Sequence, residues 1–497
     1  MGTPHRDTQA TGVGRWTGLL ALALAALLAF RLAALWMNRT DLFFDEAQYW
    51  SWSLEPAFGY YSKPPLVAWV IRLATDSCGM SEFCIRLPSP LIHTATAVVV
   101  FMLARTLYDA RTGAIAALVF ATIPGVSVSA GIISTDVPLL FFWALALLAL
   151  VHLFESRAWW PALLLGLALG FGLNAKYAMA WLVGCLAVYL VVTPERRSIL
   201  TDARLYVALA IAGLLIAPNL AWNEAHSFAT FAHTADNAKW SGRIGNPLKA
   251  LEFLAAQFGV FGPILFASLI VVTWRAWKEG LPAADRLLLA FSLPLIVVIT
   301  GQAFLSRAHA NWAAVSYVAA TVLVTATMIR DFEWRWLKAS LSLHVLVVAL
   351  VAAATALAGS VALPDGRDPF ARTLGWRAVA AATRAELEAA RRAGRPYAAV
   401  LTDERALTAE LLYYMRDEPT PILAWRESGR PKDHYELTRA YPRGGPEPVI
   451  LVSLTEKPTR ITQAFRKAEL IATREVPAGS SEVRRVTFHA LAGYDSR

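Results

Sequence analysis

Two adjacent carboxylates, Asp45 and Glu46, follow the first long apolar run of the chain, and Lys63 lies in the same polar loop. The loop also holds three tyrosines, Tyr49, Tyr60 and Tyr61. Carboxylates beside lipid are costly to desolvate, so an ionisable cluster at the end of a membrane segment points to function. A carboxylate can accept a proton and a lysine can bind an anion, so we expect proton transfer beside an anionic group.

The same two carboxylates suit the first turn of a helix, where negative charge offsets the partial positive charge of the helix end. We therefore predict interfacial helices at residues 45–52 and from Leu66 to residue 73. Pro64 and Pro65 fit the start of the second helix. Lys63 would then lie at a helix N-terminus, a place that favours an anion.

Further polar residues lie at the ends of apolar segments that we expect to reach the same membrane face. Asp136 begins one segment and Lys176 with Tyr177 forms a short turn. His309 and Asn311 open another segment. Asp136, His309 and Asn311 could instead cap helices, and Lys176 could extend toward the lipid interface.

The composition identifies an integral membrane protein. Of 497 residues, 56% are hydrophobic and 17% are charged, and the mean hydropathy is +0.45. A helix needs about 20 mainly apolar residues to cross a bilayer. We predict eleven spans, near residues 15–36, 88–107, 112–127, 134–154, 158–173, 177–193, 204–221, 253–274, 286–304, 311–329 and 339–361.

The net charge of +9 has a topological explanation. Lys and Arg are spread among loops instead of forming one stripe, which argues against a nucleic-acid partner. They concentrate in the short turns that a cytoplasmic N-terminus would leave inside, as the positive-inside rule requires. With eleven spans, the Asp45 loop and the C-terminal region then lie on the outer side.

The chain predicts two domains. Residues 1–363 form the membrane domain with the outer loop 37–87, and residues 364–497 form a small soluble α/β domain. We expect helices at 376–393 and 404–416 and strands at 397–401, 421–424 and 449–454. This second domain contains no phosphate-binding loop or catalytic cluster that the sequence reveals, so we interpret it as accessory.

The three cysteines are Cys78, Cys84 and Cys185. The first two lie in the predicted outer loop, and the sequence leaves open whether they form a disulfide. Cys185 lies in a span and is expected to pack there. No Cys and His spacing resembles a zinc site, and we predict no metal ligands.

Taken in order, the motifs of this chain resemble the bacterial glycosyltransferase family 39. Its relatives are the protein O-mannosyltransferases and the ArnT-like aminoarabinose transferase that modifies lipid A. The matching motifs lie at residues 43–50, 59–66, 86–88, 135–143, 175–177 and 309–312. The resemblance covers about residues 15–330 and extends less distinctly to the tail.

The resemblance implies a GT-C fold, that is, a polytopic α-helical membrane protein with a small extracytoplasmic domain. It implies transfer of a hexosyl or pentosyl group from a polyprenyl (undecaprenyl) phosphate carrier. The acceptor would be lipid A, another glycolipid, a polysaccharide or a protein. The enzyme would lie in the bacterial inner membrane, with its active site and C-terminal domain in the periplasm.

It also assigns roles to residues. Asp45 matches the proposed general base, Asp136 a second active-site carboxylate and Lys63 a phosphate ligand. The other predicted substrate-binding residues are Glu46, Tyr49, Tyr60, Tyr61, Lys176, Tyr177, His309 and Asn311. The resemblance implies that no cofactor is required. Position 62 is a serine, where relatives often carry an acidic residue, and the sequence leaves open whether a divalent cation binds there.

A transporter or lipid flippase is the alternative, since it would also be polytopic and carry intramembrane charges. It would place those charges near the bilayer midplane and show paired halves with broken helices. The acidic residues here lie at one predicted face and no paired halves are visible, so we favour the inverting glycosyltransferase.

Overall fold

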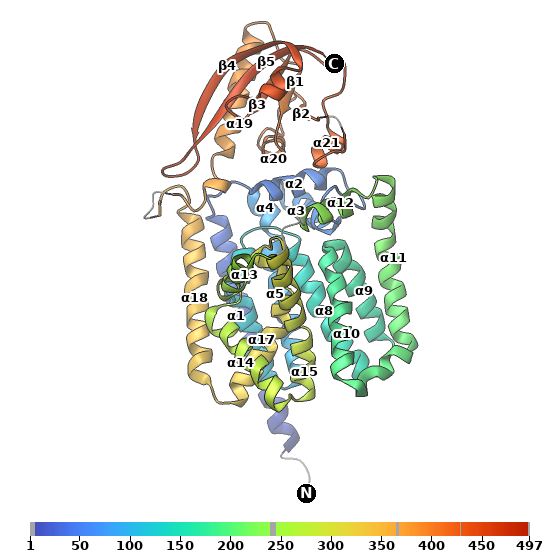
Figure 1. The fold of residues 1–497 in the computed structure, drawn as a ribbon. Helices are drawn as coiled ribbons and strands as arrows, with labels where there is room; N and C mark the ends of the chain where they lie inside the picture. Colours follow the sequence, from blue (N-terminus) through green and yellow to red (C-terminus); the bar gives the residue numbers. More distant parts are fainter. Residues whose placement is uncertain (1–4, 239–244, 364–366, 428, 496–497) are drawn as a thin grey trace. The chain divides into compact units, whose positions relative to one another are not determined.

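The computed structural model describes residues 5–238, 245–363, 367–427 and 429–495 (Figure 1). The chain forms two compact units. The helical unit comprises residues 1–35, 63–67 and 86–352. The mixed unit comprises residues 36–62, 68–85 and 353–497, so most of the predicted outer loop groups with the C-terminal residues. The boundary expected at residue 364 falls outside the described residues and stays a prediction.

Helices make up the helical unit, because its long apolar runs lack polar breaks except at short turns. Its elements are α1 (His5–Trp36), α5 (Pro88–Leu107), α6 (Ala110–Thr122), α7 (Pro124–Ser129), α8 (Asp136–Glu155), α9 (Trp160–Ala175), η1 (Tyr177–Ala180), α10 (Trp181–Val192), η2 (Pro194–Thr201), α11 (Ala203–Ala225), α12 (Ala229–Ala238), α13 (Pro247–Val260), α14 (Pro263–Glu279), α15 (Ala283–Ala290), α16 (Leu293–Leu305), η3 (Ala310–Ala313), α17 (Ser316–Arg330) and α18 (Trp334–Ala356).

Several of these helices can cross a membrane. Within the described residues, six are long and apolar enough to span, and a bent pair would make a seventh. Four shorter apolar helices, α6, α9, η1 with α10, and α17, coincide with further predicted spans. The chain is thus a multi-pass membrane protein, while the number eleven stays a prediction.

The span predicted near residues 253–274 is broken in the structure. The segment consists of α13 and α14, with a bend of 117° between them, and whether the pair is one span stays open. Gly262 joins them with φ of +98°, a left-handed conformation that favours glycine. A Cβ at this position would lie 2.6 Å from Nε2 of His344, so both the backbone and the packing require glycine.

The mixed unit combines short helices with one sheet. Its helices are α2 (Phe44–Leu54), α3 (Leu66–Cys78, which begins in the helical unit), α4 (Glu82–Arg86, which ends in it), η4 (Ala371–Thr373), α19 (Trp376–Arg392), α20 (Arg405–Tyr414), α21 (His434–Thr438) and α22 (Thr459–Thr462). Its strands are β1 (Ala399–Thr402), β2 (Ile422–Ala424), β3 (Val449–Ser453), β4 (Phe465–Pro477) and β5 (Val483–Tyr494). The helices predicted at 45–52, 376–393 and 404–416 are confirmed.

The five strands form a mixed sheet in the order β2-β1-β3-β5-β4 (Figure 1). β1 pairs in parallel with β2 and β3, whereas β5 is antiparallel to β3 and β4. Every residue of β1 and β3 is buried, as expected for strands covered on both faces. Helices α19 and α20 supply Val379, Leu407 and Leu411 to one of the two cores.

The sequence did not predict the long hairpin of β4 and β5. β4 lies at the edge of the sheet and is mostly exposed, with charged residues such as Lys467, Glu469 and Arg474 along it. Charged side chains protect an exposed edge from pairing with other chains. They also remove the apolar alternation by which a strand is recognised in a sequence.

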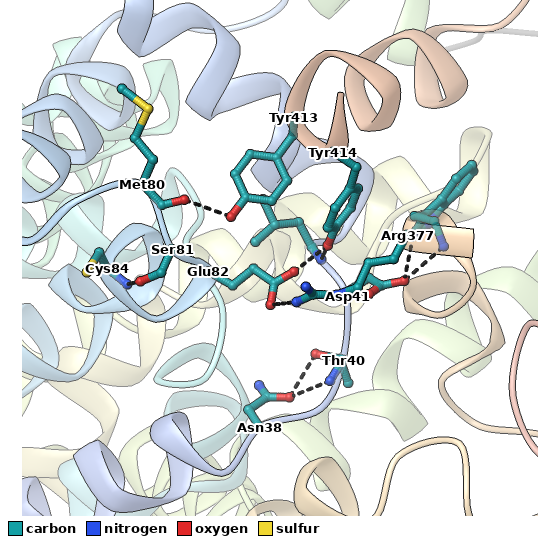
Figure 2. A network of polar contacts seen from close by, with 12 residues as sticks. Asn38, Thr40, Asp41, Met80, Ser81, Glu82, Cys84, Arg377, Tyr413 and Tyr414 are labelled. Atoms are coloured by element: carbon teal, nitrogen blue, oxygen red, sulfur yellow. Dashed lines mark hydrogen bonds and ion pairs between the residues drawn. The ribbon is translucent and has the colours of Figure 1, made fainter. Parts of the chain in front are cut away.

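A polar network joins the Asp41 loop to the α/β sheet domain within the mixed unit (Figure 2). Asp41 Oδ2 accepts hydrogen bonds from the backbone N–H groups of Trp376 and Arg377, at 2.8 and 3.3 Å. These groups open α19, whose preceding residue Gly375 offers no side-chain cap. Asp41 therefore caps a helix more than 330 residues away in the sequence.

Other contacts of this network hold the same loop. Arg377 pairs with Asp41, at 2.9 Å, and with Glu82, while the Tyr414 hydroxyl donates to Glu82. Cys78 and Cys84 form a disulfide, which answers the question that the sequence left open. The Tyr413 hydroxyl donates to the backbone carbonyl of Met80, close to this bridge (Figure 2).

Asp41→Ala should destabilise α19 because its first N–H groups lose their acceptor. We expect the free energy of unfolding to fall by about 1 kcal/mol, the usual effect of losing a cap. Hydrogen exchange of the backbone at the start of α19 should accelerate. Asp41→Asn, which keeps an acceptor oxygen, should show a smaller effect, and unchanged exchange in Asp41→Ala would contradict the capping role.

Candidate active site

Asp136 is held on both carboxylate oxygens within the helical unit. Lys176 Nζ donates to Oδ1 at 2.7 Å, and Asn311 Nδ2 donates to Oδ2 at 2.7 Å. The two side chains of the ion pair are mostly buried, with 20% of Lys176 and 13% of Asp136 exposed. The Asp136 carboxylate thus connects three elements: the first turn of α8, the α9–η1 junction and η3.

A cavity of about 480 Å³ opens beside this cluster. Asp136, His309 and Asn311 line it together with the hydroxyl-bearing Ser129 and Ser134. The rest of its lining is largely apolar, including Phe120, Ile123, Leu140 and Val260. A cavity with a few polar groups in an apolar wall suits a ligand that has both a polar head and an apolar chain.

Positive charge gathers at His309. Burial lowers the pKa of His309 first, and the cations of Arg307, Lys176 and Lys63 lower it further. His309 is therefore neutral at pH 7, and the charge of the site resides on the three longer side chains. Lys63 belongs to the helical unit and lies in the turn before α3, close to the predicted helix start.

Tyr177 belongs to a separate group of hydrogen-bonded side chains in the helical unit. Its hydroxyl donates to Asn219 Oδ1 at 2.7 Å and accepts from Asn223 Nδ2 at 3.2 Å. Its ring stacks on Phe231 with centroids 4.9 Å apart. These contacts anchor η1, which follows directly after Lys176.

Asp45 belongs to the mixed unit and has a cationic partner there. Arg405 Nη1 donates to Asp45 Oδ1 at 2.8 Å and to Gln48 Oε1 at 2.9 Å. About a third of each charged side chain is exposed, 38% for Asp45 and 34% for Arg405. Among the described residues, only the Oδ1 oxygen of Asp45 accepts a hydrogen bond.

Glu46 differs from its neighbour in burial and in contacts. Only 1% of the residue is exposed. Its carboxylate accepts a hydrogen bond from the Phe43 N–H at 2.9 Å, and its own N–H donates to the Phe43 carbonyl. Glu46 therefore stabilises the start of α2, and its role as a substrate ligand stays a prediction.

The three tyrosines of the loop are buried in the mixed unit. The Tyr60 hydroxyl donates toward the carbonyls of Trp52 and Glu55, and burial raises the pKa of Tyr60 to about 12. The Tyr61 hydroxyl donates to the Pro431 carbonyl at 2.7 Å. Tyr49 packs against Trp52, with ring centroids 5.2 Å apart. Their substrate contacts also stay predictions.

The structure thus brings together Asp136, Lys176, His309 and Asn311 in one unit and leaves Asp45 with a different set of neighbours in the other. Sequence reasoning missed Arg405 and Gln48. Arg405 lies 360 residues after Asp45, and nothing in its own surroundings marks it. Gln48 lies one turn after Asp45 on α2, so its helical spacing could have indicated a shared face.

The described residues contain no group of three or more His, Cys, Asp or Glu side chains that could hold a metal ion. Asp136 has two nitrogen donors as neighbours, so its carboxylate oxygens are already engaged.

Asp136→Ala should leave the Lys176 ammonium mostly buried without its counterion. We expect the free energy of unfolding to fall by roughly 3 kcal/mol, as for other broken buried ion pairs. The double variant Asp136→Ala with Lys176→Met should recover part of this loss, because the uncompensated charge is gone. Heat-induced unfolding of the purified proteins measures the effect, and strictly additive losses would contradict the pairing.

Comparison with known proteins defines the class of this site. The sequence profile of the family described as dolichyl-phosphate-mannose-protein mannosyltransferase matches residues 62–222. The chain is 37% identical to the lipid A galacturonosyltransferase RgtD of Rhizobium johnstonii, over 83% of this chain and 86% of that protein. It is 31% identical to an undecaprenyl phosphate-alpha-4-amino-4-deoxy-L-arabinose arabinosyl transferase of Pseudomonas aeruginosa, over 28% of this chain and 26% of that protein.

The fold is similar to that of ArnT from Cupriavidus metallidurans, solved with bound undecaprenyl phosphate. The TM-score is 0.65 with 16% sequence identity, covering 96% of this chain and 99% of that one. The chain therefore has the GT-C fold of membrane glycosyltransferases, with a small C-terminal sheet domain. It belongs to the bacterial glycosyltransferase family 39, which includes the ArnT-like and protein O-mannosyltransferase-like enzymes. This membership assigns the chain to the glycosyltransferases, not to the transporters.

Proposed function

We propose that this enzyme transfers a sugar from a polyprenyl phosphate carrier to lipid A or a related envelope glycolipid, with inversion at the anomeric carbon. The observation that carries the proposal is the Asp136–Lys176–Asn311 cluster beside a cavity of about 480 Å³ with a mostly apolar wall. A lipid-linked donor needs both features, because its phosphate and sugar are polar and its isoprenoid chain is not.

The reaction is a single displacement. The acceptor hydroxyl oxygen attacks the anomeric carbon, the bond from that carbon to the phosphate oxygen breaks, and the electron pair leaves with the polyprenyl phosphate. The hydroxyl proton passes to a carboxylate, a step that typically contributes ~10²–10⁴-fold in rate. The products are the glycosylated acceptor and the polyprenyl phosphate anion.

Asp45 suits the role of base better than Asp136. Both oxygens of Asp136 already accept hydrogen bonds, from Lys176 and Asn311, so this carboxylate serves to orient its neighbours. Asp45 has one engaged oxygen, and 38% of its side chain is exposed. An accessible oxygen is what proton transfer from an incoming hydroxyl requires.

The cations of the helical unit suit the leaving phosphate. Lys63, Lys176 and Arg307 all exert their charge at His309, which lines the cavity. A phosphate that departs as an anion gains most from positive charge that is already in place, because no reorganisation is needed during the reaction. We assign Lys63 as the phosphate ligand, as the motif order implies.

We further propose galacturonic acid as the donor sugar. Support comes from the identity of 37% over 83% of the chain with a lipid A galacturonosyltransferase, whereas the arabinosyl transferase of Pseudomonas aeruginosa matches over 28%. Chemistry also supports it, since a uronic acid adds a carboxylate to the phosphate, and Arg307, Lys176 and Lys63 all bring positive charge to His309 at the cavity. The enzyme would lie in the inner membrane with a cytoplasmic N-terminus and a periplasmic site.

Purification followed by mass spectrometry of the bound lipid tests the donor. We expect a polyprenyl phosphate carrying a hexuronic acid, with the headgroup mass distinguishing it from aminoarabinose. Lys63→Gln should lower the amount retained at least tenfold, because the leaving phosphate loses its cation. Equal retention by Lys63→Gln would contradict the phosphate role, and an aminoarabinose headgroup would contradict the sugar.

Asp45→Asn should lower kcat at least 100-fold while the protein stays folded and still retains the donor, because only proton removal is lost. Transfer from polyprenyl phosphate galacturonic acid to purified lipid A measures it. Asp76→Asn is the matched control, because Asp76 is an exposed carboxylate on α3 that pairs only with Arg72 among the described residues. Normal turnover in Asp45→Asn would overturn the assignment of the base.

A further inference from the structure

We propose that Arg405 is a positioning residue for the Asp45 carboxylate, which makes the C-terminal α/β region part of the catalytic apparatus and not an accessory. The inference rests on the proposed role of Asp45 as base. It adds a residue that no sequence motif indicated, and it gives the α/β region a chemical task.

The geometry of the contact is specific. Arg405 Nη1 donates to Asp45 Oδ1 at 2.8 Å and to Gln48 Oε1 at 2.9 Å, so one nitrogen joins two side chains of α2. The guanidinium carbon lies 4.8 Å from the centre of the Phe44 ring, which supports its flat face. These three contacts leave the arginine little freedom, and they fix the rotation of the Asp45 carboxylate.

The backbone that carries Arg405 is also held. Arg405 is the first residue of α20, and α20 packs on α2 within the mixed unit. At the other end of α20, the Tyr414 hydroxyl accepts a hydrogen bond from the Leu42 N–H, and Tyr413 packs edge-on against Trp50. The two helices therefore form one body, which holds Arg405 and Asp45 in the same position relative to each other.

Stability alone does not account for the pair. An ion pair with a third of each side chain exposed contributes about 0–1 kcal/mol. A fixed carboxylate, by contrast, can matter strongly for rate, because a misplaced base loses its alignment with the hydroxyl. Since Arg405 donates to Oδ1, the other oxygen of Asp45 is left to take the proton.

The charge of Arg405 is permanent. Burial lowers the pKa of Arg405, but the Asp45 carboxylate outweighs this effect, so the pKa lies above its ordinary value. The other titratable groups that act on the guanidinium are Tyr49 on α2 and Tyr435 on α21. Burial raises the pKa of Tyr435, so its hydroxyl stays protonated and neutral.

Arg405→Gln tests the proposal in the full-length enzyme with polyprenyl phosphate galacturonic acid and purified lipid A. We expect kcat to fall about 10- to 100-fold with the donor KM unchanged, because alignment and not binding is lost. In the Asp45→Asn background the same substitution should have no further effect on kcat, because no carboxylate is left to position. Arg405→Lys should restore only part of kcat, since an ammonium keeps the charge but not the flat face that packs on Phe44.

Arg474→Gln is the control, because this arginine lies on the exposed edge strand β4 and pairs with Glu386 of α19. It should leave kcat unchanged. Gln48→Met, which removes the second acceptor, should also lower kcat at an unchanged donor KM, and it keeps the test valid if Arg405→Gln does not fold.

The outcomes separate this inference from the proposed function. An inactive Asp45→Asn together with an Arg405→Gln enzyme of normal kcat overturns the role of Arg405 alone. An active Asp45→Asn overturns the base assignment and the positioning role with it. An equal fall in kcat when Arg405→Gln is introduced into Asp45→Asn reduces the arginine to a structural contact and also overturns the proposal.

Discussion

Charge compensation at the ends of membrane helices is the constraint on which this structure depends. A carboxylate near hydrocarbon is tolerated only when it is paired or hydrogen-bonded, because water is not there to solvate it. Asp136 meets this condition through Lys176 and Asn311, which are 40 and 175 residues away in the sequence. Three parts of the helical unit are thereby tied together at the cavity, and the same contacts that allow the charge also fix its orientation.

Asp136 and Asp45 differ in how many of their carboxylate oxygens accept hydrogen bonds, and this difference bears on which of them can take a proton. Asp136 uses both oxygens for its partners and is mostly buried, which suits a residue that organises its surroundings. Asp45 uses one oxygen and stays partly exposed, which suits proton transfer. These hydrogen bonds are the basis of the roles that we propose for the two residues, whereas the Glu46 carboxylate binds the Phe43 N–H at the start of α2.

The outer loop obtains its order from the C-terminal residues of the mixed unit. Asp41 caps α19, and Glu82 binds Arg377 and Tyr414 (Figure 2). Arg405 of α20 reaches Asp45 in the same unit. The segments that join α2, α3 and α4 have few regular hydrogen bonds of their own, so they need such external partners to be ordered. This explains why most of the loop forms one unit with residues distant in the sequence, and it argues that the α/β sheet domain is required for more than solubility.

Much of the architecture could be predicted because it follows from local composition. The apolar segments, the helices at α2, α19 and α20, and the buried strands β1 and β3 each carry their own pattern of hydrophobic residues. The broken segment at Gly262 and the β4–β5 hairpin were missed. A left-handed glycine between two apolar stretches and a charged edge strand leave no hydrophobic pattern that distinguishes them.

The sequence by itself determined the membrane class, the family and the polar residues that we propose for the chemistry, because side-chain type and order along the chain are enough for these. Only the tertiary structure decided which oxygen of each carboxylate is engaged and which residues engage it. Lys176, Asn311 and Arg405 reach their partners across 40, 175 and 360 residues. Such pairings depend on how helices pack and not on any local pattern of residues. Only the hydrogen bonds in the folded chain therefore distinguish Asp45, the proposed base, from Asp136, which orients its neighbours.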